Sequence, residues 1–100
     1  MKNIVENNKL LAEFLGHSLF DGINYYEPRD MKFHNNWNYL MQVVEKIKNI
    51  SYGNIEIMEV VCSLRNKSIT YWDNELYITQ NILEVYEDAL EFVKWYNEQK

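Results

Sequence analysis

Six aromatic and basic residues form the part of this sequence whose chemistry is most suggestive. Three lie between residues 17 and 34, two lie at a predicted hairpin turn, and one lies on the strand that follows this turn. They are Tyr26, Arg29, Lys32, Arg65, Lys67 and Trp72. Aromatic faces stack on nucleobases, and guanidinium and ammonium groups pair with phosphate. The set therefore predicts a binding site for a small nucleotide. The alternative is that Trp72 is an ordinary sheet residue.

Four acidic residues follow one another at helical spacing near the end of the chain. They are Glu84, Glu87, Asp88 and Glu91. Like charges three or four positions apart cost a helix about 0.2–0.5 kcal/mol per pair. The helix dipole offsets this cost only within the first turn. Either the strip is a solvated helix face, or it binds the basic surface of a host nucleic-acid-binding or defence protein.

No arrangement of residues in the sequence predicts catalysis, a metal site or a cofactor. Cys62 has no histidine near it in sequence, so a buried structural thiol is the favoured interpretation. His17 and His34 lack the companion ligands that zinc requires. The three glycines are scattered and cannot form a phosphate-binding loop. We therefore expect a non-enzymatic protein without catalytic residues, metal or cofactor.

Three amphipathic helices are expected to position these residues. The first runs from about Asn3 to Leu15, the second from about Asn36 to Asn49, and the third from an N-cap near Thr79 to the C-terminus. In each of them apolar residues recur at three- and four-residue steps. A long connection between residues 17 and 34 includes a short extended piece around Ile23–Tyr26.

Strands are expected between the second and third helices. Ile55–Leu64 is rich in Ile, Val and Met and predicts a strand, bulged between Glu56 and Glu59. Ser68–Trp72 predicts a second strand that forms an antiparallel hairpin with the first. Leu76–Ile78 could add a third. The expected class is α+β: one domain over residues 1–100, with a small antiparallel sheet of two or three strands packed by three helices, in the order α-loop-α-β-β-α.

Composition and charge limit the partners of the chain. Residues 1–72 carry eight acidic and eight basic residues, so the net charge of −5 lies wholly in residues 73–100. An acidic chain lacks the basic footprint of nucleic-acid binding. No apolar run approaches the ~20 residues of a membrane span, and no signal peptide is visible. We expect a cytoplasmic protein without membrane contact, and its aromatic-rich surface favours a homo-oligomer.

Three helical segments carry a resemblance to a known family. They are Asn8–Gly16, Phe33–Ile47 and Ala89–Asn97. They include His34 and Trp37 before Leu40-Met41, the run Val43–Ile47, and the closing run Glu91–Tyr96. In these positions the chain resembles the phage ABA-sandwich domain family of small phage and prophage proteins. Gln42 stands where that family often has proline.

The resemblance implies a helix/sheet/helix sandwich in a phage or prophage setting, and it supplies no catalytic residues. The expected function is that of a counter-defence factor in the host cytoplasm, which sequesters a nucleotide immune signal. The alternative is an acidic inhibitor of a host nucleic-acid-binding or defence protein.

Overall fold

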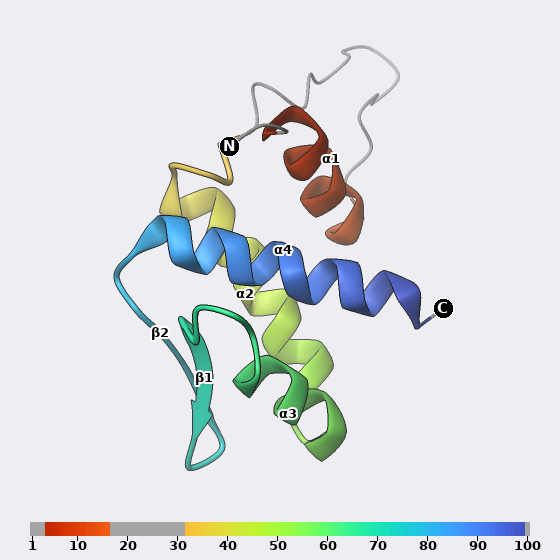
Figure 1. The fold of residues 1–100 in the computed structure, drawn as a ribbon, viewed down its shortest axis with the longest axis vertical. Helices are drawn as coiled ribbons and strands as arrows, with labels where there is room; N and C mark the ends of the chain where they lie inside the picture. The colour runs from red at the N-terminus through yellow and green to blue at the C-terminus, as the bar shows by residue number, and fades with distance from the viewer. Residues whose placement is uncertain (1–3, 17–31, 100) are drawn as a thin grey trace.

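Four helices and one two-stranded sheet form within residues 4–16 and 32–99, which are the part of the chain that the computed structural model describes (Figure 1). In chain order they are α1 (Ile4–Phe14), α2 (Trp37–Ser51), α3 (Ile55–Cys62), β1 (Ile69–Trp72), β2 (Glu75–Ile78) and α4 (Ile82–Glu98). The predicted α+β class with a small antiparallel sheet is confirmed. The extended piece expected around Ile23–Tyr26 lies outside the described residues.

The segment Ile55–Leu64, predicted to be a strand, instead contains helix α3. The side chain of Asn54 caps it and accepts a hydrogen bond from the Ile57 amide at 3.2 Å. Val61 and Leu64 are buried, while Glu56 and Glu59 are exposed on the other face. Burial of a helical face thus overrides the strand preference of Ile and Val. The chain therefore has four helices among its described residues rather than three.

The hairpin forms one element later than predicted, between β1 and β2. Asp73 and Asn74 form its turn with φ angles of 54° and 66°, as a two-residue turn between twisted strands requires. Thr70 lies opposite Tyr77 in the antiparallel register. Thr79, predicted to cap the last helix, continues the ladder because its amide donates to the Ser68 carbonyl at 2.9 Å. Asn81 takes the capping role and accepts from the Glu84 amide at 3.2 Å.

Helix α4 crosses the middle of the molecule and contributes more buried residues to the core than any other described element. In Figure 1 it lies between α1 on one side and α3 with the hairpin on the other. Its fully buried residues include Val85, Tyr86, Ala89, Phe92 and Val93. Helices α1 and α2 both pack against it. The turn between α3 and β1 also contacts this helix, through hydrogen bonds from Asn66 and Ser68 to Asp88.

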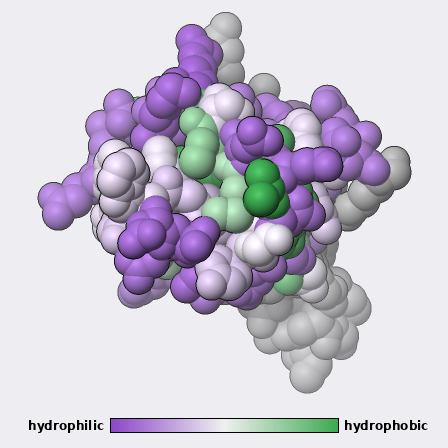
Figure 2. Space-filling model, turned by 90° about the horizontal axis from the view of Figure 1, so that it is seen from below, coloured by the Kyte–Doolittle hydropathy of each residue, from purple (hydrophilic) through white to green (hydrophobic). Residues whose placement is uncertain are grey.

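The surface near α3 and the hairpin tip is mostly hydrophilic. Figure 2 views the molecule from below and shows a small hydrophobic group surrounded by hydrophilic residues. Ile55 of α3 is 74% exposed. No helix among the described residues is long and apolar enough to cross a membrane.

Candidate functional site

A buried carboxylate on α4 holds the turn that joins α3 to β1. The side chain of Asp88 is fully buried. Its Oδ1 accepts a hydrogen bond from the Asn66 amide at 3.0 Å, and its Oδ2 accepts from the amide and hydroxyl of Ser68 at 2.9 and 2.6 Å. Hydrogen bonds to a charged acceptor are stronger than neutral ones and satisfy the buried charge. Asp88 thus fixes residues 66–68 against α4.

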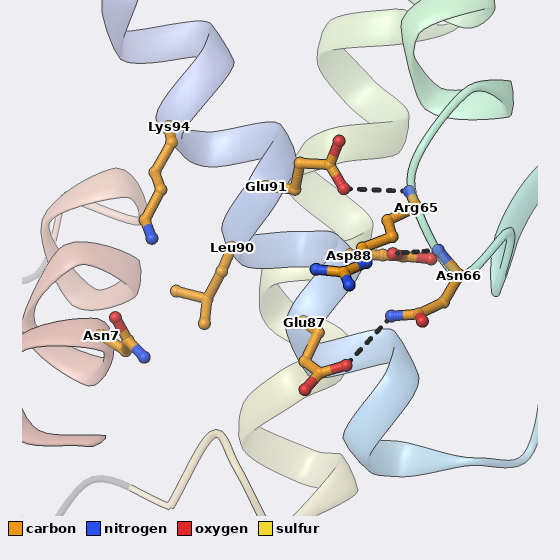
Figure 3. Close-up of a pocket in the computed structure, with 8 residues that line it drawn as sticks. All are labelled: Asn7, Arg65, Asn66, Glu87, Asp88, Leu90, Glu91 and Lys94. Carbon is orange, nitrogen blue, oxygen red and sulfur yellow. Dashed lines mark hydrogen bonds between the residues drawn. The ribbon is translucent and has the colours of Figure 1, made fainter. Parts of the chain in front are cut away.

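Two neighbouring carboxylates bind the same turn from the surface. Oε1 of Glu91 accepts from the Arg65 amide at 2.9 Å, and Oε1 of Glu87 accepts from Nδ2 of Asn66 at 3.1 Å (Figure 3). The backbone carbonyl of Glu84 accepts from the same Asn66 amide group at 3.5 Å. These bonds offset the like-charge repulsion along α4.

The predicted acidic strip of Glu84, Glu87, Asp88 and Glu91 is therefore largely engaged within the chain. Asp88 lies beneath the surface on which such a strip would meet a partner. The spacing of the four acids does not reveal which donors they bind, because the turn lies about 20 residues upstream. A clue was the polar run Asn66-Lys67-Ser68, whose backbone amides need acceptors.

A cavity of about 640 Å³ opens between α1, the turn and α4. Its lining residues are Asn7, Arg65, Asn66, Glu87, Asp88, Leu90, Glu91 and Lys94. Figure 3 shows the Arg65 guanidinium, the Lys94 ammonium and the Asn7 amide arranged around Leu90. Among the described residues, neither the Arg65 guanidinium nor the Lys94 ammonium has a side-chain hydrogen bond or ion pair.

The acidic and the basic side chains of this cavity therefore differ in whether they already have hydrogen-bond partners. The carboxylates of Glu87, Asp88 and Glu91 each accept hydrogen bonds from the turn. The described part of the chain leaves the donors of the two cationic groups available. An anionic group with an apolar or planar part fits such a lining, because guanidinium and ammonium donate to anionic oxygen while Leu90 offers an apolar contact.

The structure does not bring the predicted nucleotide-binding residues together within one chain. Arg65 lines the cavity, whereas Lys67 donates to the Cys62 carbonyl at 3.3 Å and lines a separate hollow beside α3. Trp72 lies at the hairpin turn and is 74% exposed. Lys32 is exposed at the start of the second described range. Tyr26 and Arg29 lie outside the described residues.

Four cavity residues were not among the predicted site residues: Asn7, Asn66, Leu90 and Lys94. Asn7 and Lys94 lie on the polar faces of α1 and α4, whereas the helix predictions were based on the apolar faces. Lys94 is the single basic residue between positions 73 and 99, and that isolation in an acidic segment was the available signal. Asn7 carries no comparable signal, since its role arises from the packing of α1 against α4.

A second polar cluster connects α1, α4 and the residues before α2. Nδ2 of Asn8 donates to Nδ1 of His34 at 3.2 Å, and the Tyr86 hydroxyl donates to Oδ1 of Asn8 at 3.0 Å. The His34 ring also packs edge-on against Tyr86, with centroids 6.1 Å apart. Burial raises the pKa of Tyr86 to about 12.

This cluster joins α1, α4 and the residues before α2 through hydrogen bonds and an aromatic contact. Burial raises the pKa of Tyr86, so its hydroxyl keeps the proton that it donates to Asn8. Cys62 is half-buried at the end of α3 rather than in a strand. In residues 4–16 and 32–99 no group of three or more His, Cys, Asp or Glu side chains could hold a metal ion.

Comparison of the chain with protein-family models, curated proteins and solved structures finds no match. The cavity between α1, the turn and α4 is the candidate functional site on its own geometry.

Proposed function

We propose that this protein is a non-enzymatic binding protein that sequesters a small nucleotide-type anion in the cavity between α1, the turn and α4. The observation that carries the proposal is the pair of cationic groups, Arg65 and Lys94, that line the cavity without partners among the described residues, while the adjacent carboxylates are engaged. A volume of about 640 Å³ lies in the range of small-molecule sites.

The lining supports a particular type of nucleotide. Arg65 and Lys94 suit the anionic oxygens of a nucleotide, the Asn7 amide suits the hydrogen-bonding edge of a base, and Leu90 suits an apolar contact. Glu87 and Glu91 at the same cavity disfavour a ligand with several negative charges. We therefore expect cyclic nucleotides, with one charge per phosphodiester, to bind more tightly than nucleoside triphosphates.

The setting that we propose is that of a phage accessory protein that removes a host nucleotide signal. It rests on the resemblance of the three helical segments described above. The ligand class rests on the cavity alone, so the two parts of the proposal can be tested separately.

Isothermal titration calorimetry with a panel of cyclic and linear nucleotides tests the ligand class. We expect Arg65→Gln and Lys94→Gln each to weaken binding of a cyclic nucleotide by about 10- to 100-fold, the loss that follows removal of a charged hydrogen bond. Lys67→Gln is the matched control, since it removes the same charge from a residue outside the cavity and should leave binding unchanged.

Either of two results would contradict this proposal. The panel could give no heat of binding with the wild-type chain. Alternatively, Lys67→Gln could weaken binding as much as Arg65→Gln, which would place the ligand on the set predicted from sequence rather than in the cavity.

A further inference from the structure

Strand β2 has one free edge within the described part of the chain, and the register identifies which backbone groups point outward. The Thr79 amide donates to the Ser68 carbonyl, so these two residues form a hydrogen-bonded pair. Such pairs alternate along an antiparallel ladder, so Thr70 with Tyr77 and Trp72 with Glu75 are also hydrogen-bonded pairs. The amide and carbonyl groups of Leu76 and Ile78 therefore point away from β1.

The opposite edge of the sheet is covered, whereas no described element covers this one. Helix α3 packs along β1, and β2 forms the outer side of the hairpin in Figure 1. Edge strands are usually protected by lysine, proline or a bulge. The strand Glu75–Ile78 has none of these, and its single charge is at Glu75, whose Oε2 accepts from the Tyr77 hydroxyl at 2.8 Å.

Two hollows lie beside β2, where one face of α2 meets the strand. Trp37 and Met41 line one of about 490 Å³ with Ile78. Lys48 and Tyr52 line the other, of about 550 Å³, with Leu76 and Tyr77. The side chains of directly opposed residues in an antiparallel pair share one face. Residues that pair with Leu76 and Ile78 would therefore point into these hollows.

We propose that β2 pairs antiparallel with β2 of a second copy of this chain, around a two-fold axis at Tyr77. Leu76 of each copy then faces Ile78 of the other, so all the outward backbone groups of both strands are matched. Glu75 faces Thr79 of the second copy, so the one charged side chain of the strand does not face itself. Each copy fills the hollows of the other with Leu76 and Ile78.

The pairing also accounts for two exposed features of this face. Tyr77 is 48% exposed and Met41 is 39% exposed, and both lie next to the edge that the second copy covers. A two-stranded hairpin is of marginal stability, whereas the joined hairpins form a four-stranded sheet. The helices α2 of both copies then lie on the same face of that sheet.

Sedimentation velocity of the full chain at about 0.1 mM tests the pairing, with circular dichroism to check that each variant is folded. We expect the wild type to sediment as a dimer. Tyr77→Lys and Tyr77→Glu each place like charges opposite one another at the two-fold axis, and each should weaken dimerisation about tenfold. Trp72→Lys is the matched control, because it makes the same change on the same face of the neighbouring strand, away from the edge.

Mixing the two Tyr77 variants gives the sharpest result. The lysine introduced in one chain and the glutamate introduced in the other would attract across the axis, so the mixture should regain the dimerisation that each variant alone has lost. A monomeric wild type overturns the proposal and leaves the edge to an extended peptide of another protein. Dimers of Tyr77→Lys as stable as the wild type overturn it as well, as does a mixture that dimerises no better than either variant.

Discussion

At the scale of single residues, Asp88 has the largest structural role in the polar part of the molecule. It is buried and accepts three hydrogen bonds from two residues of the turn. Removing one partner from such a site leaves buried donors unsatisfied, which costs more than the net value of the bonds. The Asp88 side chain also holds the turn that presents Arg65 to the cavity.

Asp88→Ala is therefore expected to lower the free energy of unfolding by about 2–4 kcal/mol. The measurement is chemical denaturation followed by circular dichroism. Glu98→Ala, an acid removed from the exposed end of the same helix, is the control and should change stability by less than about 0.5 kcal/mol. Equal stability of the two variants would show that the hydrogen bonds of Asp88 contribute nothing.

At the scale of the elements, each of three helices begins at an asparagine. Asn36, Asn54 and Asn81 cap α2, α3 and α4, and each side-chain oxygen accepts from an amide in the first turn. Capping matters most for α3, which has eight residues and several β-branched side chains. A helix this short is marginal alone and depends on its cap and on packing.

Asn54→Ala should destabilise the protein by about 1 kcal/mol, because the Ile57 amide loses its acceptor. Thermal unfolding measures the change. Asn38→Ala provides the comparison: Asn38 is exposed within the first turn of α2 and is not the residue that caps it, so alanine there should be neutral or slightly stabilising. Equal destabilisation by Asn54→Ala and Asn38→Ala would contradict the capping role of Asn54.

At the scale of the whole molecule, the polar cluster around Tyr86 joins distant parts of the chain. Its hydroxyl donates to Asn8, 78 positions away, and Asn8 donates in turn to His34. Burial disfavours the charged tyrosinate and so raises the pKa of Tyr86 to about 12. Because the folded pKa lies above the usual 10, wild-type stability is complete below about pH 10 and falls as pH rises toward 12.

Tyr86→Phe keeps the ring but removes the hydroxyl, so we expect a loss of about 1 kcal/mol at about pH 8. The variant has no hydroxyl to ionise, so its stability does not fall through this group at high pH. The free energy of unfolding of the wild type minus that of the variant should therefore shrink above about pH 10 and then change sign. Denaturant titrations from about pH 8 to about pH 11.5 measure it. Tyr77, whose pKa is raised chiefly by its hydrogen bond to Glu75, is present in both chains and cancels. A difference that stays constant with pH would contradict this account.

Local sequence signals predicted three of the four described helices to within a few residues. The periodicity of α1, α2 and α4 and the cap at Asn36 depend on neighbours within one or two turns, so sequence alone determines them. The β-favouring run Thr70-Tyr71-Trp72 likewise predicted β1.

Tertiary structure decided the state of Ile55–Cys62 and the candidate site. The β-branched residues of α3 favour a strand locally, and the burial of Val61 against the core, together with the cap at Asn54, selects a helix. The carboxylates of α4 gain their hydrogen-bond donors only when the turn at residues 65–68 packs against the helix. This turn lies about 20 positions earlier in the sequence, so the spacing of the acids does not reveal it. Arg65 and Lys94 likewise share a cavity only because α4 brings the turn and α1 together. Contacts between distant segments depend on the packing of whole elements, which local patterns of residues do not encode.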